Sequence, residues 1–394
     1  MTSQFDIIVY GATGFTGRLI AEYLNQTYGN GDTITWAMAG RSQAKLEEVR
    51  DLIGAPADTP LVVADSSDIE SMSFMVAKTK LVISTVGPYQ LYGDNLVEAC
   101  ANAGTDYVDL CGESVWMRQM IDAHEDAAKA SGARIVFSCG FDSIPSDLGV
   151  YKLQKLAIEQ TGSPCKVVNG RVRAMQGTFS GGTAASIKVS FAAAKEDPEI
   201  YALAIDDYAL VPTSQTPGVS RVEQPKGDMV VYDETMGTWL APFIMAAINT
   251  RNVHRSNFLL GHQYGADFTY DEMMMTGPGE KGEEMANFVA SSTKMTDEDG
   301  PKPGEGPSKE EREAGFFDIL YIGTTNDGST IKVSVKGDRD PGYGSTSKML
   351  SEAGLCLIED ATELPGGIWT TAPAMGDKLI ARLESKAGLT FSVE

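Results

Sequence analysis

The sequence predicts an α/β protein, with a doubly wound parallel sheet in its N-terminal part and an α+β domain in its second part. Residues 1–140 alternate short apolar runs with amphipathic stretches, which is typical of βαβ units. Two of these runs, Asp6–Tyr10 and Lys80–Thr85, are largely apolar, as expected for parallel strands buried on both faces. With 394 residues, the chain is also too long for one hydrophobic core.

The N-terminal elements follow from this alternation. Helical periodicity is clearest over Leu91–Ala103 and Val115–Ala130. Strands are expected at Phe5–Tyr10, Ile34–Ala39, Leu61–Ala64, Leu81–Thr85, Tyr107–Leu110 and Arg134–Phe137. We expect residues 1–150 to form the parallel-sheet domain.

A different pattern begins after residue 140. A helix is expected from near Pro145, with Ser143 as its N-cap, because proline is favoured in the first helical turn. The other expected elements are a strand at Lys166–Met175, a helix at Gly181–Ala194, a hairpin of Phe316–Thr324 with Thr330–Lys336, and helices at Tyr343–Ile358 and Met375–Leu383. We expect residues 151–340 to form an α+β domain for substrate binding or dimerisation. Within it, residues 296–315 are charged and rich in proline and glycine, which predicts a flexible acidic loop.

Composition narrows the function. The net charge of −22 argues against nucleic acid as a partner and means that local groups must hold any polyphosphate ligand. Three histidines and five scattered cysteines show no metal-ligand or disulfide spacing, so no metal site is expected. The N-terminus lacks the basic start of a signal peptide, and the longest apolar stretch, Trp239–Ile248, is too short to span a bilayer. We therefore expect a cytoplasmic protein with reduced cysteines.

A glycine-rich turn follows the first expected strand. It reads Gly11-Ala12-Thr13-Gly14-Phe15-Thr16-Gly17, and a helical pattern continues from Arg18 to Leu24. In this order of strand, turn and helix, the N–H groups at the helix start bind the pyrophosphate of a dinucleotide. The glycines permit the tight turn, the approach of the phosphates and close packing of the helix. The sequence thus predicts a Rossmann-type site that includes Gly11, Ala12, Thr13, Gly14, Phe15 and Thr16.

The end of the second strand indicates which dinucleotide binds. NAD-specific sites place an acidic residue there to bind the ribose hydroxyls. This chain has Arg41 followed by Ser42, a guanidinium and a hydroxyl that suit the 2′-phosphate of NADP. Such charged hydrogen bonds favour NADP over NAD by about 10- to 100-fold. Asp65, after the third strand, either contacts the adenine or caps a helix.

The fourth strand leads into a turn at the carboxyl edge of the sheet, where dinucleotides extend toward the nicotinamide. We expect Thr85, Val86 and Gly87 to contact the cofactor. Tyr89 follows them and is the candidate proton donor, with packing as its alternative role. Further polar candidates beyond strand ends, each of which is otherwise a cap, a loop anchor or a buried thiol, are Asp109, Glu113, Asp142, Cys111 and Cys139.

A second catalytic pattern is rejected. Ser138, Tyr151 and Lys155 have the Ser…Tyr-x-x-x-Lys spacing of short-chain dehydrogenases. An additional strand between the fourth strand and Ser138 shifts the helix that carries Tyr151, so we interpret this spacing as ordinary packing of an amphipathic helix.

Several segments resemble the saccharopine dehydrogenase-like oxidoreductases, specifically their trans-acting enoyl reductase branch. The segments, which span almost the whole chain, are Gly11–Gly17, Ala39–Ser42, Ser84–Tyr89, Tyr107–Glu113, Cys139–Asp147, Ser180–Thr183, Pro242–Asn249 and Gly366–Phe391. The resemblance implies an NADP-linked reductase of enoyl groups in lipid or polyketide-type intermediates, with links to glycolipid synthesis and membranes. It also implies that residues 341–394 return to the Rossmann domain.

Two other functions stay open: oxidoreduction at a C–N or carbonyl carbon, as in the saccharopine enzymes, and NADP-dependent regulation without turnover. The expected partner is an acyl substrate, either free or bound to a carrier, and a homodimer is a further expectation. Apolar residues 239–248, followed by Arg251, His254 and Arg255, suit an acyl pocket, peripheral membrane contact or a carrier phosphate. They equally suit a core helix followed by a solvated turn.

Overall fold

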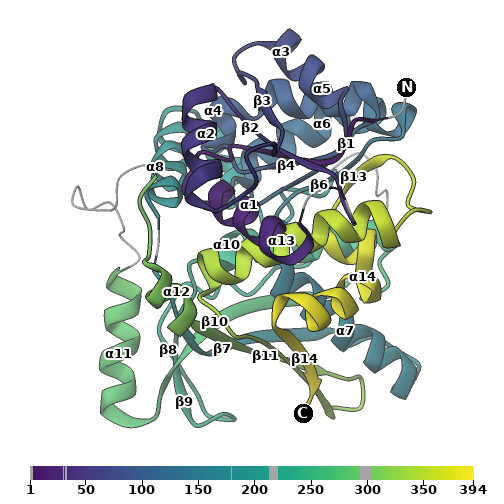
Figure 1. Ribbon diagram of the computed structural model, residues 1–394. Helices are drawn as coiled ribbons and strands as arrows, with labels where there is room; N and C mark the ends of the chain where they lie inside the picture. Colours follow the sequence, from purple (N-terminus) through teal and green to yellow (C-terminus); the bar gives the residue numbers. More distant parts are fainter. Residues whose placement is uncertain (1–2, 30, 32, 179, 213–220, 293–303) are drawn as a thin grey trace.

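The strands form two seven-stranded sheets, stacked one above the other in Figure 1. The computed structural model describes residues 3–29, 31, 33–178, 180–212, 221–292 and 304–394. The first sheet carries the N-terminal part of the chain and the second sheet most of the remainder.

The first sheet has the strand order β13-β6-β5-β4-β1-β2-β3, and every pair in it is parallel. Its strands are β1 (Phe5–Tyr10), β2 (Trp36–Gly40), β3 (Leu61–Val63), β4 (Thr79–Ser84), β5 (Asp106–Asp109), β6 (Arg134–Val136) and β13 (Gly367–Trp369). Its helices are α1 (Phe15–Tyr28), α2 (Gln43–Leu52), α3 (Ile69–Val76), α4 (Tyr89–Tyr92), α5 (Asp94–Ala103) and α6 (Ser114–Ser131). The predicted doubly wound sheet is confirmed, and the strand order reverses between β1 and β4.

The second sheet has the order β14-β12-β11-β7-β10-β9-β8, with β7 and β10 parallel and the other pairs antiparallel. Its strands are β7 (Val167–Gln176), β8 (Val231–Asp233), β9 (Thr238–Pro242), β10 (Thr269–Gly277), β11 (Phe316–Thr324), β12 (Thr330–Gly337) and β14 (Leu389–Val393). The helices of this part are α7 (Ile144–Thr161), α8 (Gly181–Glu196), α9 (Pro198–Ile205), α10 (Ala246–Leu259), α11 (Gly279–Ser292) and α12 (Lys309–Ala314). The predicted second α+β part and its hairpin are confirmed.

Helices α7 and α10 pack on the inner face of the second sheet. The hydroxyl of Tyr321 on β11 lies 3.4 Å from Ser146 on α7, and Asn249 on α10 donates to Glu272 on β10 over 2.8 Å. Ser143 precedes α7 as predicted, but its side chain makes no capping hydrogen bond.

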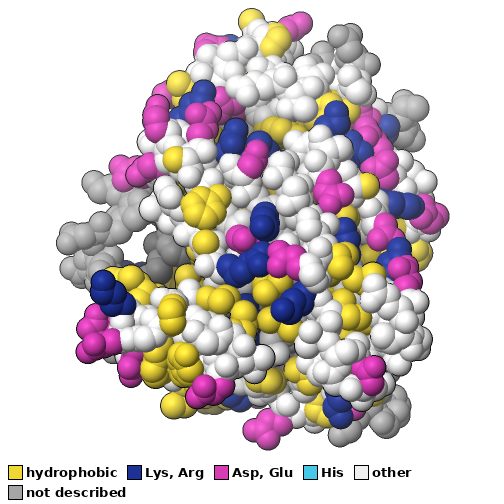
Figure 2. All heavy atoms as spheres, turned by 90° about the horizontal axis from the view of Figure 1, so that it is seen from below, with side chains coloured by type: hydrophobic (Ala, Val, Ile, Leu, Met, Phe, Trp, Pro, Cys, Tyr) yellow, Lys and Arg dark blue, Asp and Glu magenta, His cyan; other side chains and the backbone are white. Residues whose placement is uncertain are grey.

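The outer face of the second sheet is polar. Arg173 on β7 pairs with Asp318 on β11 and with the terminal residue Glu394, each at 2.7 Å, and Lys336 on β12 lies 3.4 Å from Asp318. Seen from this side, Lys, Arg, Asp and Glu side chains gather near the middle of the view, with hydrophobic side chains around them (Figure 2). The strand expected at Lys166–Met175 is confirmed as β7, which is partly exposed toward its C-terminal end.

The C-terminal segment contributes to both sheets. It runs through the π-helical turn η1 (Pro341–Ser345), α13 (Thr346–Leu355), η2 (Cys356–Asp360), β13, α14 (Thr371–Arg382), η3 (Leu383–Ala387) and β14. Strand β13 pairs with β6 in the first sheet, whereas β14 pairs with β12 in the second. The domain boundaries at residues 150 and 340 stay predictions.

The expected loop at 296–315 is partly wrong. Residues 296–303 lie outside the described residues, but Lys309–Ala314 form helix α12. Ser308 and Glu311 close a capping box, in which each side chain bonds the other's backbone N–H. High charge favours a loop, but Ser308-x-x-Glu311 is itself a helix-start signal.

Candidate active site

The glycine turn lies at the carboxyl ends of β1 and β4. Gly11 has φ +89°, which favours glycine, and the N–H of Gly14 donates to the carbonyl of Gly11 over 2.8 Å. A Cβ at Gly17 would lie 2.2 Å from the Gly11 carbonyl oxygen, and one at Gly11 would lie 2.6 Å from Thr85 Oγ1. Gly14 is exposed. The turn is therefore closely packed at Gly11 and Gly17 and exposed at Gly14, where the sequence predicts that a phosphate approaches.

The start of α1 leaves backbone donors for an anion. The first helical hydrogen bond runs from Arg18 N to Gly14 O over 3.0 Å. The N–H groups of Phe15, Thr16 and Gly17 precede it and lack an intrahelical acceptor. These residues fit the pyrophosphate of a dinucleotide, as the sequence predicts.

Arg41 and Ser42 lie at the end of β2 beside this turn. Arg41 is exposed, and no carboxylate of the described residues forms an ion pair with it. Ser42 accepts a hydrogen bond from Lys45 N over 3.4 Å as the N-cap of α2, which leaves its hydroxyl proton for another acceptor. The pair therefore fits a phosphate monoester.

Asp65 orders its own turn. Its Oδ1 accepts hydrogen bonds from the N–H and the hydroxyl of Ser67 at 3.0 and 2.9 Å, and these bonds lower the pKa of Asp65. The positive charge of Arg41 adds to this effect, so the two side chains lie near each other. The helix-cap alternative for Asp65 is wrong, because the N-cap of α3 is Asp68; contact of Asp65 with the adenine stays a prediction.

The geometry of Tyr89 argues against its predicted role as proton donor. Its side chain is 4% exposed, its hydroxyl donates to Ser84 O over 3.2 Å, and its ring packs on Trp116. Leu110 N also donates to this hydroxyl, over 3.4 Å. Burial raises the pKa of Tyr89 well above its usual range. The hydroxyl is used in the core and is not presented to a substrate.

Two of the candidate carboxylates anchor loops. Glu113 accepts from the backbone N–H groups of Tyr89 and Gln90 over 2.8 and 2.9 Å. Asp109 accepts from Cys111 N at 3.0 Å and from Ser138 N and Tyr107 Oη at 2.9 Å each, while burial raises the pKa of Asp109 to about 7.

Asp142 differs from both. Within the described part of the chain, its carboxyl group has no hydrogen-bond or ion-pair partner, and it is neither fully buried nor exposed. Burial alone raises the pKa of Asp142 to about 7. A Cβ at Gly112 would lie 3.5 Å from its Oδ2. The group thus lies beyond the carboxyl ends of β5 and β6, two strands along the sheet edge from the glycine turn.

The surroundings of Asp142 join it to the glycine turn. Tyr343 from η1 packs edge-on against Phe15 with ring centroids 5.1 Å apart, and the charge of Asp142 contributes to the raised pKa of Tyr343. The Tyr343 hydroxyl bonds Ser180 N and lies 2.9 Å from Thr183 Oγ1 at the start of α8. Sequence reasoning missed Tyr343, because its position depends on a segment more than 300 residues away from Phe15.

The cysteines are not poised as nucleophiles. Cys111 and Cys139 are fully buried, and burial raises the pKa of each thiol well above its usual range. Both would therefore stay protonated at neutral pH.

The three residues of the rejected Ser-Tyr-Lys pattern have structural contacts, as expected. Ser138 is buried and donates to Cys111 O over 2.6 Å. Tyr151 Oη and Lys155 Nζ instead lie 3.5 and 2.5 Å from Asp377 on α14. The three side chains do not converge.

The basic cluster after residue 248 is not a surface feature, and the expected solvated turn is wrong. Residues 239–248 divide between β9 and α10, and Arg251, His254 and Arg255 are buried on α10. Arg251 Nε donates to Asp206 O over 3.0 Å, and Arg255 donates to the carbonyls of Leu210 and Ile368 over 2.8 and 2.6 Å. These side chains cannot contact a membrane or a carrier phosphate.

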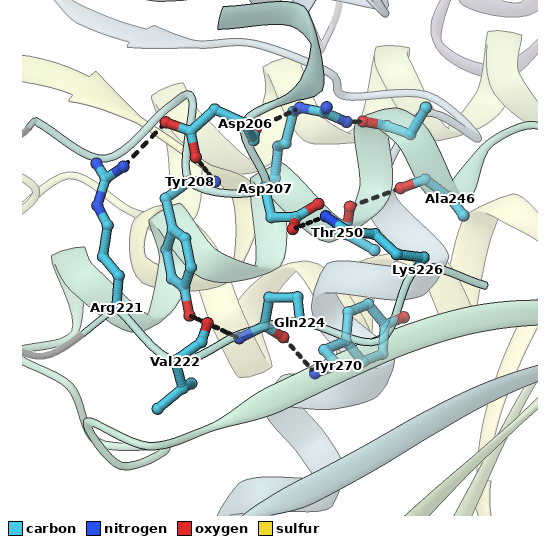
Figure 3. Close-up of polar contacts among 12 residues, drawn as sticks. Asp206, Asp207, Tyr208, Arg221, Val222, Gln224, Lys226, Ala246, Thr250 and Tyr270 are labelled. Carbon is cyan, nitrogen blue, oxygen red and sulfur yellow. Dashed lines mark hydrogen bonds and ion pairs between the residues drawn. The ribbon is translucent and has the colours of Figure 1, made fainter. Parts of the chain in front are cut away.

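The segment before β8 holds this region together. Arg221 pairs with Asp206, Lys226 pairs with Asp207, and Gln224 bridges Tyr208 Oη and Tyr270 N (Figure 3). An open pocket of about 480 Å³ lies nearby, on the outer face of the second sheet; its lining includes Arg171, Lys226, Asp271 and Met273. Because Asp271 and Met273 alternate with the inward-facing Tyr270 and Glu272, this pocket is separate from the glycine turn.

Within the described ranges, no helix has both the length and the apolar character required to cross a bilayer.

Comparison with known proteins also indicates an NADP-binding oxidoreductase. Residues 7–136 match the model of the saccharopine dehydrogenase NADP binding domain. The chain is 40% identical over an alignment of 413 residues to a Mycobacterium tuberculosis protein with the provisional name of trans-acting enoyl reductase, covering 98% of this chain and 97% of that one. It is 38% identical over 405 residues to the trans-acting enoyl reductase of Mycobacterium bovis, covering 96% of both chains.

A solved structure shares the fold. The apo histidine-tagged saccharopine dehydrogenase (L-Glu forming) from Saccharomyces cerevisiae matches with a TM-score of 0.55 and 11% identity over 99% of each chain. The predicted family, the oxidoreductase class and NADP as cofactor are thereby confirmed. The chain belongs to the trans-acting enoyl reductase family and carries the saccharopine dehydrogenase NADP-binding domain at its N-terminal end.

Proposed function

We propose that this chain uses NADPH to reduce a C=C bond conjugated to a carbonyl in an acyl intermediate of the lipid or polyketide type. The relatives' name supports the reaction class. The observation that carries the proposal is the unpartnered Asp142 carboxyl, which lies at the same sheet edge as the glycine turn.

The cofactor residues follow the predicted pattern. The turn Gly11–Thr16 would hold the pyrophosphate, and Arg41 with Ser42 would hold the 2′-phosphate. Thr85, Val86 and Gly87 would contact the nicotinamide part of the cofactor. A Cβ at Gly87 would lie 3.4 Å from Ser186 Oγ, so α8 lies beside this turn, while Gly87 itself stays exposed.

The reduction adds one hydride and one proton. When bound, NADPH supplies the hydride to the β-carbon of the enoyl group. Asp142 gives its proton to the α-carbon, where the π electron pair of the C=C bond forms the second C–H bond. The carboxylate then takes a proton from water, which restores the acid. A pKa of about 7 keeps a substantial fraction of Asp142 protonated at neutral pH.

A substrate screen tests the proposal. NADPH oxidation is followed at 340 nm with an enoyl thioester, an imine and a ketone, each at matched concentration. We expect turnover with the enoyl thioester. Turnover restricted to the imine or the ketone would show chemistry of the saccharopine type, and cofactor binding without turnover on any acceptor would show a regulator. Either result contradicts the proposal.

A further inference from the structure

Helix α12 and the turn before it lie against the first turn of α1. A Cβ at Gly306 would lie 2.6 Å from Phe15 Cε1, so the backbone at this position rests on the Phe15 ring. The guanidinium carbon of Arg312 lies 5.7 Å from the centroid of the same ring. A residue almost 300 positions downstream therefore contacts the predicted pyrophosphate turn.

A second guanidinium lies on the same ring. Arg18 Cζ is 5.5 Å from the Phe15 centroid, and Tyr343 fills the edge of the ring. Phe15 is the first residue of α1, and its own N–H is one of the free donors at the helix start. Two guanidinium groups therefore lie against the side chain of the residue that begins α1.

Arg312 keeps donors available there. Its Nη1 donates to Pro307 O over 2.7 Å, and no other hydrogen bond from its guanidinium is found among the described residues. The nearby carboxylate of Asp340 accepts from Tyr343 N and Gly344 N at 3.0 and 2.7 Å, and the charge of Arg312 opposes the rise that burial causes in the pKa of Asp340. An arginine has five N–H donors, in an arrangement that matches phosphate oxygens.

We infer that Arg312 binds the pyrophosphate of NADP(H) and so closes the cofactor site from the second part of the chain. This inference rests on the proposed cofactor site at Gly11–Thr16. The net charge of −22 repels a polyphosphate on average, so cations placed at the helix start must offset that repulsion. Arg312 adds such a cation beside the backbone donors.

The role of Arg312 differs from that of Arg41. The pyrophosphate is common to NADPH and NADH, whereas the 2′-phosphate belongs to NADPH alone. Loss of Arg312 therefore weakens the binding of both dinucleotides by the same factor, whereas loss of Arg41 weakens the binding of NADPH only.

The role of Arg312 is tested by titration calorimetry on the full-length protein. The ligands are NADPH, NADH and 2′-AMP, which lacks a pyrophosphate. In R312Q we expect the dissociation constants of both dinucleotides to rise about tenfold, with that of 2′-AMP unchanged. R312K should recover part of the loss. The matched control is K309Q, which removes the same charge from an exposed side chain of α12 that lies 4.0 Å from Glu313; its affinities should equal those of the wild type.

The outcomes separate the two claims. If wild-type protein binds neither dinucleotide, the proposed function fails. If it binds both, but R312Q keeps wild-type affinities or loses affinity for NADPH alone, the inference about Arg312 is overturned. Thermal melting of the ligand-free variants shows whether they fold. If R312Q is destabilised and its affinity for 2′-AMP falls as much as its affinity for the dinucleotides, Arg312 has a structural role instead.

Discussion

At the scale of single residues, what separates a structural carboxyl from a catalytic one here is whether it has partners. Burial raises the pKa of both Asp109 and Asp142 to about 7. Asp109 accepts three hydrogen bonds, two from neighbouring loops and one from Tyr107 on its own strand, whereas the carboxyl of Asp142 accepts none within the described part of the chain. Only Asp142 can exchange a proton with a ligand without breaking the fold around it.

Replacement of Asp142 by Asn should therefore remove the proton donor and retain the shape. We expect kcat with an enoyl thioester to fall by about 10²-fold or more, with NADPH affinity unchanged. In the wild type, kcat should decline as pH rises through about 7, because the acid form of Asp142 is lost above its pKa.

Tyr89→Phe is the control for this prediction. It removes a buried hydroxyl whose partners among the described residues are two backbone groups, so activity and the pH profile should stay close to the wild type. A loss of activity in the Tyr89 variant with full activity in the Asp142 variant would reverse the two assignments.

At the scale of elements, Asp109 ties together the loops that carry the site. Its Oδ1 holds Cys111 N after β5 and Ser138 N after β6, and its Oδ2 holds the Tyr107 hydroxyl. Asp109→Ala would leave three buried polar groups without an acceptor. We expect a loss of about 3 kcal/mol or more in the free energy of unfolding, measured by urea denaturation.

Asp109→Asn should cost far less. An amide oxygen can still accept from both N–H groups, and the Tyr107 hydroxyl can accept from the amide nitrogen. Equal stability of the Ala and Asn variants would show that Asp109 does not anchor these loops through hydrogen bonds.

The elements that could be predicted from sequence are those with local causes. Strand β1 and the turn at Gly11 follow from an apolar run and from glycines whose φ value or close packing requires them. Arg255 shows the opposite case. A charged side chain favours a solvated turn. The Arg255 guanidinium instead donates to the carbonyls of Leu210 and Ile368, which only the folded chain brings together. Tyr89 was placed correctly at the sheet edge, while its inward orientation depends on Trp116 and on backbone groups of β4.

At the scale of the whole molecule, the C-terminal segment joins the two sheets. Glu352 on α13 accepts from the hydroxyls of Tyr23 and Tyr28 on α1 over 2.6 and 2.7 Å and from Arg382 on α14 over 2.7 Å. The family resemblance implies such a return, but composition and periodicity do not, because Tyr23 and Tyr28 lie more than 300 residues from Glu352 in the sequence.

Buried carboxyls also set how stability varies with pH. The pKa values of Asp109 and Asp142, about 7, exceed the ordinary value of 3.8, so the folded chain binds more protons than the unfolded chain between these values. Stability that depends on these protons is lost as pH rises through about 7. Burial lowers the pKa of His254 to about 3. Its contribution makes the stability rise with pH, but only below about pH 6.5.

We therefore expect the free energy of unfolding, from urea titrations, to be lower at pH 8 than at pH 6.5. The Asp109→Asn variant should show a smaller difference between the two pH values. An unfolding free energy that rises over this interval would mean that these carboxyls are ionised in the folded chain.

The central claim is that an NADP dinucleotide binds at the start of α1 with its 2′-phosphate on Arg41. Calorimetric titration of the wild type and of Arg41→Gln with NADPH and NADH tests it most directly. The account predicts that wild-type protein binds NADPH about 10- to 100-fold more tightly than NADH, and that the substitution removes this preference while NADH affinity stays the same. No uptake of NADPH, a preference for NADH, or an unchanged preference in the Arg41 variant would contradict it.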